Sequence, residues 1–166
     1  MKNLVLIGMM GCGKSTCGRA LATALGRKFV DTDREIVRQA GMPISEIFAT
    51  KGEAHFRQLE TEVAKKLKNR KNLVIATGGG MILAEENRQC LRENGVIIFL
   101  NRDPSAIFDT ADMGGRPLGQ DGKASFLERF ATREPIYRQT AHVEITNFNS
   151  VRHTATEILK KTEGML

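Results

Sequence analysis

A glycine-rich segment near the N-terminus is the clearest candidate for chemistry in the sequence. Residues 8–15 read Gly-Met-Met-Gly-Cys-Gly-Lys-Ser and satisfy the pattern G-x-x-x-x-G-K-S/T at every fixed position. The glycines allow backbone N–H groups to face one point, which forms a nest for phosphate at the N-terminus of the following helix. A strand-like run at residues 4–7 and a helical pattern at residues 14–25 supply the expected flanks. The sequence therefore predicts a phosphate-binding loop that holds ATP.

The side chains of this loop have distinct expected roles. Lys14 can reach the β- and γ-phosphates, and the hydroxyl of Ser15 can coordinate Mg²⁺. Thr16 adds a hydroxyl near the α-phosphate. Modification of the Cys12 thiol is expected to inhibit, as a side effect of its place in the loop. The predicted ATP-binding set within the loop is Gly11, Cys12, Gly13, Lys14, Ser15 and Thr16.

Two carboxylates follow the second strand-like run. Asp31 and Asp33 flank Thr32 directly after residues 28–30. Because ligands bind at the carboxyl ends of strands in a doubly wound sheet, both carboxylates are expected to face the phosphate loop. One can help to hold the water shell of Mg²⁺, and the other can accept a proton from an attacking hydroxyl. The competing interpretation is a plain helix N-cap at Asp31 or Asp33.

An arginine between two carboxylates is the next candidate. Arg57 has Glu53 one turn before it and Glu60 one turn after it on a predicted helix. A guanidinium held in this way can present two donors to a substrate carboxylate. The alternative is a surface ladder of ion pairs, which would contribute little to stability.

Three glycines and a second arginine complete the candidate site. Gly78, Gly79 and Gly80 follow the third strand-like run, where they either make a turn or admit a ligand against bare backbone. Arg133 stands two residues before Pro135, which predicts that a helix begins near it. A cation at a helix N-terminus opposes the macrodipole, so Arg133 is expected to serve another purpose.

These residues must be positioned by a sheet with helices on both faces. Apolar runs suited to strands lie at residues 4–7, 28–30, 73–76, 96–100 and 143–145. Three of them are nearly continuous in apolar residues, as parallel strands covered on both faces are. Helical patterns occupy residues 14–25, 33–40, 52–68, 84–94 and 151–161. This alternation predicts an α/β fold with a doubly wound parallel sheet and right-handed crossovers.

One glycine-rich segment does not fit the alternation. Residues 109–123 contain four glycines, Pro117 and few apolar side chains. A mobile surface loop is the simple interpretation, whereas Arg116 in its middle favours a lid that closes over bound phosphates. No linker or internal repeat divides the sequence, so residues 1–166 are predicted to form a single domain that carries this lid.

Composition is ordinary for a globular protein, with 41% apolar and 27% charged residues. No apolar run approaches the roughly 20 residues that span a bilayer. The opening residues are too few for a signal peptide, so a cytoplasmic location without a membrane is expected. Three cysteines without a C-x-x-C spacing and three scattered histidines predict neither a disulfide framework nor a zinc site.

The formal charge of +6 is compatible with nucleic acid or with small anions as partners. One tyrosine, no tryptophan and no basic stretch interleaved with aromatic residues argue against the stacking of bases. Small anionic molecules are therefore the expected partners, and nucleic acid is not. No long exposed apolar stripe demands a partner chain, so a monomer is expected.

Taken together, these segments resemble the shikimate kinase family. The resemblance runs from residue 4 to about residue 141 and includes the phosphate loop and the D-T-D at residues 31–33. It also includes G-E-x-x-F-R-x-x-E at residues 52–60, the glycine run, Arg116-Pro117-Leu118 and Arg133-x-Pro135-x-Tyr137. The resemblance implies a P-loop kinase fold with a five-stranded parallel sheet, and transfer of phosphate from MgATP to the 3-hydroxyl of shikimate.

The same resemblance implies roles for individual residues. Shikimate would be held by Asp33, Arg57, the glycine run Gly78, Gly79 and Gly80, and Arg133, with Phe48 and Phe56 as pocket walls. The two arginines would take its carboxylate, and Asp33 would orient or deprotonate its hydroxyl. Ser15 and, through water, Asp31 would serve Mg²⁺. Arg116 would contact ATP and join Lys14 in neutralising charge on the transferred phosphoryl group.

The sequence departs from the family pattern in the second half. Gly119 follows Arg-Pro-Leu where the family often has leucine, and the motif Y-x-E-x-A becomes Tyr-Arg-Gln-Thr-Ala at residues 137–141. Residues 108–110 read Phe-Asp-Thr around the expected adenine-facing arginine, so nucleotide preference stays open. The alternatives are a gluconate kinase-like enzyme, a nucleoside monophosphate kinase, or a nucleotide-binding module without catalysis.

Overall fold

Five parallel strands form the sheet at the centre of the protein. The computed structural model describes residues 1–110, 122–146 and 150–166. The strands are β1 (Asn3–Ile7), β2 (Lys28–Asp31), β3 (Leu73–Ala76), β4 (Gly95–Leu100) and β5 (Val143–Ile145), in the order β2-β3-β1-β4-β5. Every neighbouring pair is parallel. The predicted α/β fold with a five-stranded parallel sheet is therefore confirmed.

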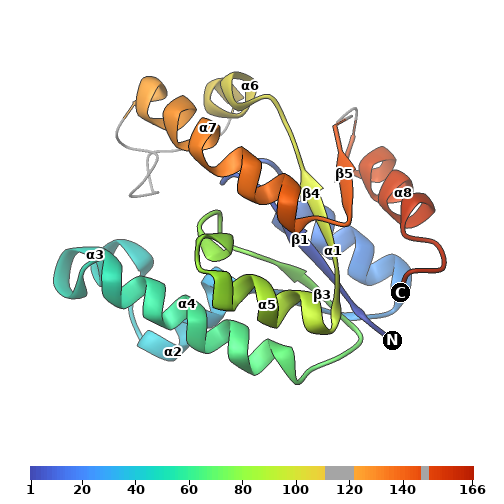
Figure 1. Ribbon diagram of the computed structural model, residues 1–166, viewed down its shortest axis with the longest axis horizontal. Coiled ribbons are helices and arrows are strands. Elements are labelled where there is room, and N and C mark those ends of the chain that lie inside the picture. The colour runs from blue at the N-terminus through green and yellow to red at the C-terminus, as the bar shows by residue number, and fades with distance from the viewer. Residues whose placement is uncertain (111–121, 147–149) are drawn as a thin grey trace.

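Helices cover both faces of this sheet. Figure 1 shows α1 (Lys14–Leu25) and α8 (Val151–Lys161) side by side on one face, with α5 (Glu85–Glu93) and α7 (Lys123–Thr140) on the other. From β1 to β2 the chain moves toward one edge of the sheet, and after β2 it moves back toward the other edge. Right-handed crossovers therefore place the helices before and after this reversal on opposite faces. β1, β3 and β4 are buried at every position, which explains their apolar composition. No helix among the described residues is both long enough and apolar enough to cross a membrane.

The remaining helices follow β2, β3 and β4 in the chain. α2 (Thr32–Ala40), α3 (Ile44–Lys51) and α4 (Glu53–Lys68) lie between β2 and β3, and the 3-10 helix η1 (Met81–Leu83) follows β3. α6 (Pro104–Thr110) follows β4. The sequence patterns located α2 and α4 to within one residue at each end but did not predict α3, α6 or η1. These three elements are short, and periodicity over so few residues is weak.

The predicted start of a helix near Arg133 is wrong. α7 runs from Lys123 to Thr140, so Arg133 lies inside it and Pro135 is an interior proline. Proline removes a backbone donor and usually begins a helix rather than occupying its interior. Here Phe126, Phe130 and Tyr137 are buried along α7, and their packing stabilises a continuous helix across the proline. Arg133 is therefore a buried mid-helix side chain, and the argument from the helix dipole does not apply to it.

Only the ends of the predicted lid can be placed. Asp109 belongs to α6 and Lys123 begins α7, and the ammonium of Lys123 pairs with the Asp109 carboxylate at 2.9 Å. The two ends of the segment are thus close together. Arg116 and Gly119 lie outside the described residues, and the roles assigned to the lid stay predictions.

Candidate active site

The phosphate loop connects β1 to α1 and has the backbone that its glycines allow. Gly8, Gly11 and Gly13 have positive φ angles of 148°, 81° and 101°. A Cβ atom on Gly8 would lie 2.8 Å from the carbonyl oxygen of Leu100, at the end of β4. The loop is therefore packed tightly on the carboxyl end of the sheet, where a side chain at this position would prevent the close approach.

Lys14 lies across this loop rather than pointing into solvent. Its ammonium donates hydrogen bonds of 2.7 Å to the carbonyl oxygens of both Gly8 and Met9, and the side chain is buried. The positive charge is thus held at the loop that the sequence assigns to phosphate. Cys12 is buried beneath it, with Sγ 3.7 Å from the Lys14 nitrogen.

Ser15 and Asp31 bring two oxygen ligands to the same point. The Ser15 hydroxyl donates to Oδ2 of Asp31 at 2.9 Å, while Oδ1 of Asp31 accepts from the backbone N–H of Asp33 at 3.0 Å. Asp31 is therefore the N-cap of α2 and also faces the phosphate loop, so the two interpretations of this carboxylate are compatible. Mg²⁺ prefers oxygen ligands and takes few from protein when phosphates supply the rest, so this pair fits a magnesium site.

Arg57 is held more firmly than a surface ion-pair ladder would hold it. Nη1 donates to Glu60 at 2.7 Å and Nη2 to Glu53 at 3.1 Å. Burial raises the pKa of Glu60, although the guanidinium opposes that shift. Burial alone would lower the pKa of Arg57, but the carboxylates of Glu60 and Glu53 outweigh it and raise that pKa. Because Glu60 is only 1% exposed, the Arg57 side chain is fixed by a buried partner.

Arg133 is a second guanidinium at the site and is almost fully buried. Burial lowers its pKa, and repulsion from Arg57 adds to the shift, whereas Tyr137 opposes it. Among the described residues, its Nη1 atom has no hydrogen-bond partner. A buried cation with an unsatisfied donor beside another cation is costly unless an anion binds to it. This arrangement makes the space near Arg57 and Arg133 the candidate anion site.

The glycine run lies among the charged groups of the site, and each glycine is close to one charged side chain. A Cβ on Gly78 would lie 2.5 Å from Oδ1 of Asp33, and a Cβ on Gly79 would lie 3.5 Å from Nη1 of Arg133. A Cβ on Gly80 would overlap the guanidinium of Arg57. The sequence offered a turn or a ligand contact as reasons for these glycines. The structure adds a third reason, because bare backbone lets three charged side chains converge.

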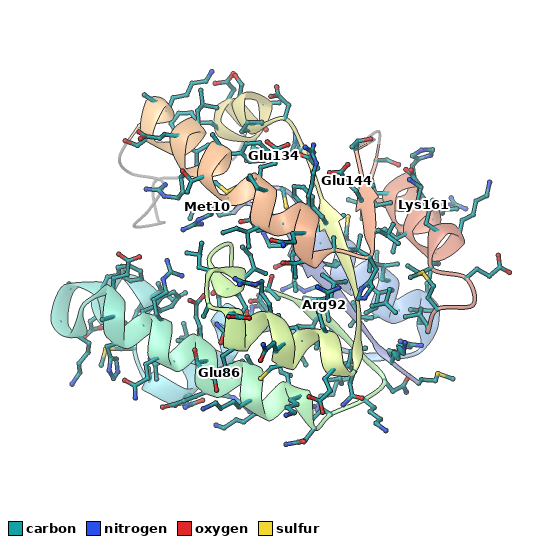
Figure 2. All side chains as sticks on the ribbon, viewed as in Figure 1. Met10, Glu86, Arg92, Glu134, Glu144 and Lys161 are labelled. Carbon is teal, nitrogen blue, oxygen red and sulfur yellow. The ribbon has the colours of Figure 1, made fainter. Side chains whose placement is uncertain are left out.

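The glycine run also contacts the phosphate loop. The backbone N of Met10 would lie 3.3 Å from a Cβ on Gly79, and Figure 2 shows Met10 on the side of α7 that faces η1. The anion site and the phosphate loop are therefore adjacent across Gly79, with Asp33 next to Gly78. Two adjacent sites are what transfer of a phosphoryl group between two bound molecules requires.

Two phenylalanines that the resemblance assigned to the pocket are in contact with each other. The rings of Phe48 on α3 and Phe56 on α4 are 4.9 Å apart between centroids. The Phe56 ring centroid is also 5.4 Å from the Arg57 guanidinium carbon, so the ring covers one face of that guanidinium. Their role as pocket walls stays a prediction.

Several residues that support the site had no role assigned from sequence. The Thr32 hydroxyl accepts from the backbone N–H of Gly78 at 2.9 Å, and it joins the D-T-D turn to the glycine run. Asn87 and Arg88 on α5 donate to carbonyl oxygens of η1 at 2.9 and 2.7 Å. Thr32 had a usable signal, because its hydroxyl stands between two predicted site carboxylates in the sequence. Asn87 and Arg88 had none, since their partners are backbone atoms.

Comparisons with known proteins agree with this geometry. The family model described as shikimate kinase matches residues 10–163. A curated shikimate kinase from Symbiobacterium thermophilum is 44% identical over 97% of this chain and 96% of its own length. The structure of a shikimate kinase from Acinetobacter baumannii in complex with shikimate has a TM-score of 0.94 and 39% identity, covering 99% of this chain and 94% of that one. A gluconokinase from Sinorhizobium meliloti, at 19% identity and a TM-score of 0.62, shares the fold alone.

Proposed function

Because the chain belongs to the shikimate kinase family, we propose that it transfers the γ-phosphoryl group of ATP to the 3-hydroxyl of shikimate, giving shikimate 3-phosphate and ADP. The pair of arginines beside the phosphate loop carries the proposal. Arg57 approaches the glycine run from α4, and Arg133 approaches it from α7. The buried Nη1 of Arg133 has no hydrogen-bond partner among the described residues, and a ring carboxylate would accept from it in the planar form that guanidinium groups bind best.

Capture of shikimate fixes the position of its hydroxyl. Arg57 is oriented by Glu60 and Glu53, so it loses little side-chain entropy when the carboxylate binds. With the carboxylate held by both arginines, the hydroxyl at the other side of the ring lies toward Asp33 and the phosphate loop. Positioning of this kind supplies most of the rate enhancement in phosphoryl transfer.

The transfer step uses a carboxylate to accept the proton of the hydroxyl and cations to stabilise the phosphoryl group. Asp33 accepts the proton of the hydroxyl as its oxygen attacks the γ-phosphorus of ATP, and ADP leaves. Lys14 stabilises the negative charge on the transferred group. Mg²⁺, held by Ser15 and through water by Asp31, would supply further neutralisation when bound with ATP. Arg116 is proposed to add a second cation from the lid.

The proposal is tested by measuring ADP release from MgATP with shikimate, gluconate or a nucleoside monophosphate as the acceptor. Shikimate-dependent release is the expected result, and the methyl ester of shikimate should have a much higher KM because it lacks the carboxylate charge. Release with gluconate or a nucleotide alone would reassign the acceptor. Binding of ATP without release for any acceptor would indicate a nucleotide-binding module without catalysis.

The proposal includes a cytoplasmic monomer that acts on two small molecules. Support comes from the composition, which has no extended apolar stripe and no aromatic and basic stretch for nucleic acid. Sedimentation equilibrium at assay concentration measures the oligomeric state directly, and a dimer would contradict this part of the proposal.

A further inference from the structure

Tyr137 is a buried phenol at the junction of the phosphate loop, the glycine run and α7. Its hydroxyl donates a 2.5 Å hydrogen bond to the carbonyl oxygen of Gly79 and lies 3.6 Å from Sδ of Met9. The side chain has no exposed surface. Burial raises the pKa of this phenol, so the hydroxyl remains protonated and continues to donate. A bond so short and so enclosed fixes the position of the Gly79 peptide.

The ring of Tyr137 is itself fixed by the sheet. It stacks on Phe99 of β4, with 5.0 Å between centroids and 26° between the ring planes. Phe99 has no exposed surface and belongs to a strand that is buried at every position. The packing of the ring in the core therefore fixes the position of the hydroxyl that contacts the backbone of the site.

Gly79 is the point at which movement would affect substrate binding. A Cβ added to Gly79 would lie 3.3 Å from the backbone N of Met10 and 3.5 Å from Nη1 of Arg133, so Gly79 is close to both the phosphate loop and the guanidinium. Arg133 precedes Tyr137 by one turn of α7, so one helix carries both the anion-binding cation and the hydroxyl that fixes the adjacent backbone. The Tyr137 side chain also hydrogen-bonds that of Arg133, so loss of the hydroxyl releases both Gly79 and Arg133 without removing either group.

We infer that Tyr137 is a positioning residue for shikimate, because its hydroxyl joins the Gly79 carbonyl to the Arg133 side chain and so holds the glycine run against that guanidinium. This inference rests on the proposed function. The hydroxyl does not bind shikimate and takes no part in proton transfer. It sets the geometry of the carboxylate end of the site, so its removal affects capture of shikimate more than capture of ATP or the rate of transfer.

The test compares Tyr137→Phe with Thr140→Val. Each change removes one buried hydroxyl from α7, but Thr140 donates to the Ile136 carbonyl of the same helix, away from the glycine run. In Tyr137→Phe the KM for shikimate should rise about tenfold, while kcat and the KM for ATP stay within about twofold. Thr140→Val should leave all three constants at the parent values, even if its melting temperature falls as much as that of Tyr137→Phe.

A second measurement needs no variant, because the chain has one tyrosine and no tryptophan. Intrinsic emission therefore reports on Tyr137 alone, and the emission of a phenol responds to the hydrogen bond that its hydroxyl makes. Because the bond to Gly79 exists before shikimate binds, saturating shikimate should leave the emission at the level of the enzyme without ligand. A large change in emission on addition of shikimate would mean that this bond is remade on binding, and it would overturn the inference.

The outcomes separate the inference from the proposed function. Absence of shikimate-dependent ADP release from the parent enzyme would overturn the proposed function, and the inference with it. Normal turnover by the parent with an unchanged shikimate KM in Tyr137→Phe would overturn only the role of Tyr137. An equal rise in the KM for ATP and for shikimate would indicate general loosening of the fold, which also contradicts the inference.

Discussion

Arg133 combines a cost to stability with a benefit to binding. Its guanidinium is buried, and among the described residues Nη1 has no hydrogen-bond partner. Replacement of an incompletely satisfied buried charge by an apolar side chain of similar length is often neutral or stabilising. We therefore expect Arg133→Met to melt at the same temperature as the parent or higher without ligand. The same change should raise the KM for shikimate about 100-fold, because it removes a charge-assisted hydrogen bond.

Arg138 is the matched control for this prediction. It lies on the same helix, but it is exposed and pairs with Glu134 and Glu144 at the surface. Arg138→Met should change neither the KM for shikimate nor, by more than about 1 kcal/mol, the free energy of unfolding. Thermal melts and steady-state kinetics of both variants measure the contrast. A melting temperature several degrees lower in Arg133→Met would show that the arginine is a structural residue.

Asp33 is expected to act on the rate of transfer rather than on binding of ATP. Asp33→Asn keeps the shape of the side chain next to Gly78 but cannot accept the proton of the attacking hydroxyl. Loss of a general base typically lowers the rate by about 100-fold to 10,000-fold, and kcat should fall within this range. Glu35→Gln is the control, since Glu35 is on the same helix and pairs with Arg38 instead. Near-parental kcat in Asp33→Asn would refute the role of Asp33.

The glycine run allows two charged side chains to be displaced separately. A Cβ on Gly80 would overlap the Arg57 guanidinium, whereas a Cβ on Gly78 would press on the Asp33 carboxylate. In both cases the added Cβ would meet the end of a side chain rather than backbone, so the fold should survive either change. Gly80→Ala is expected to raise the KM for shikimate about tenfold, as loss of one charge-assisted bond does. Gly78→Ala should mainly lower kcat. Steady-state kinetics would contradict this assignment if both variants changed the same constant.

The helices of the site show which elements a sequence can predict. The phosphate loop, the D-T-D turn and the glycine run were located because each follows a strand, and strand ends converge in a parallel sheet. The interior of α7 was not predicted, because Pro135 is a local signal for a helix start. The burial of Phe126 and Tyr137 that overrides this signal depends on contacts with distant residues. Local patterns therefore locate the site but do not show how its second arginine is held.

Burial is the property that the sequence could not supply for the site as a whole. The E-x-x-x-R-x-x-E pattern at residues 53–60 is the same for a surface ladder and for a substrate clamp. A surface ladder and a substrate clamp differ here in the burial of Glu60, which pairs with Arg57. Only the assembled fold determines that burial. The Tyr137 hydroxyl and the Gly79 carbonyl are 58 residues apart, and no periodicity connects them. The charged residues were thus predictable, while the contacts that orient them were not.

The sheet itself contains a pH-sensitive contact at its edge. Nδ1 of His142 accepts a 2.9 Å hydrogen bond from the backbone N–H of Ile97, and the backbone N–H of His142 donates to the Ile97 carbonyl. Burial lowers the pKa of His142, and the nearby charges of Arg92 and Lys2 lower it further. Protonation destroys the acceptor. The contribution of this contact is therefore complete above the unfolded pKa of about 6.5, and it is lost as pH falls through the lower folded pKa.

His142→Ala should destabilise the protein by about 1 kcal/mol at neutral pH, because the buried Ile97 N–H loses its partner. The difference in unfolding free energy between parent and variant should shrink as pH falls from about 7.5 to about 5, since the parent loses the same bond on protonation. Urea unfolding across this range measures the difference, with His153→Gln at an exposed position of α8 as the control. A difference that stayed constant with pH would mean that the imidazole contributes by packing alone, and that β4 and β5 are joined independently of its charge.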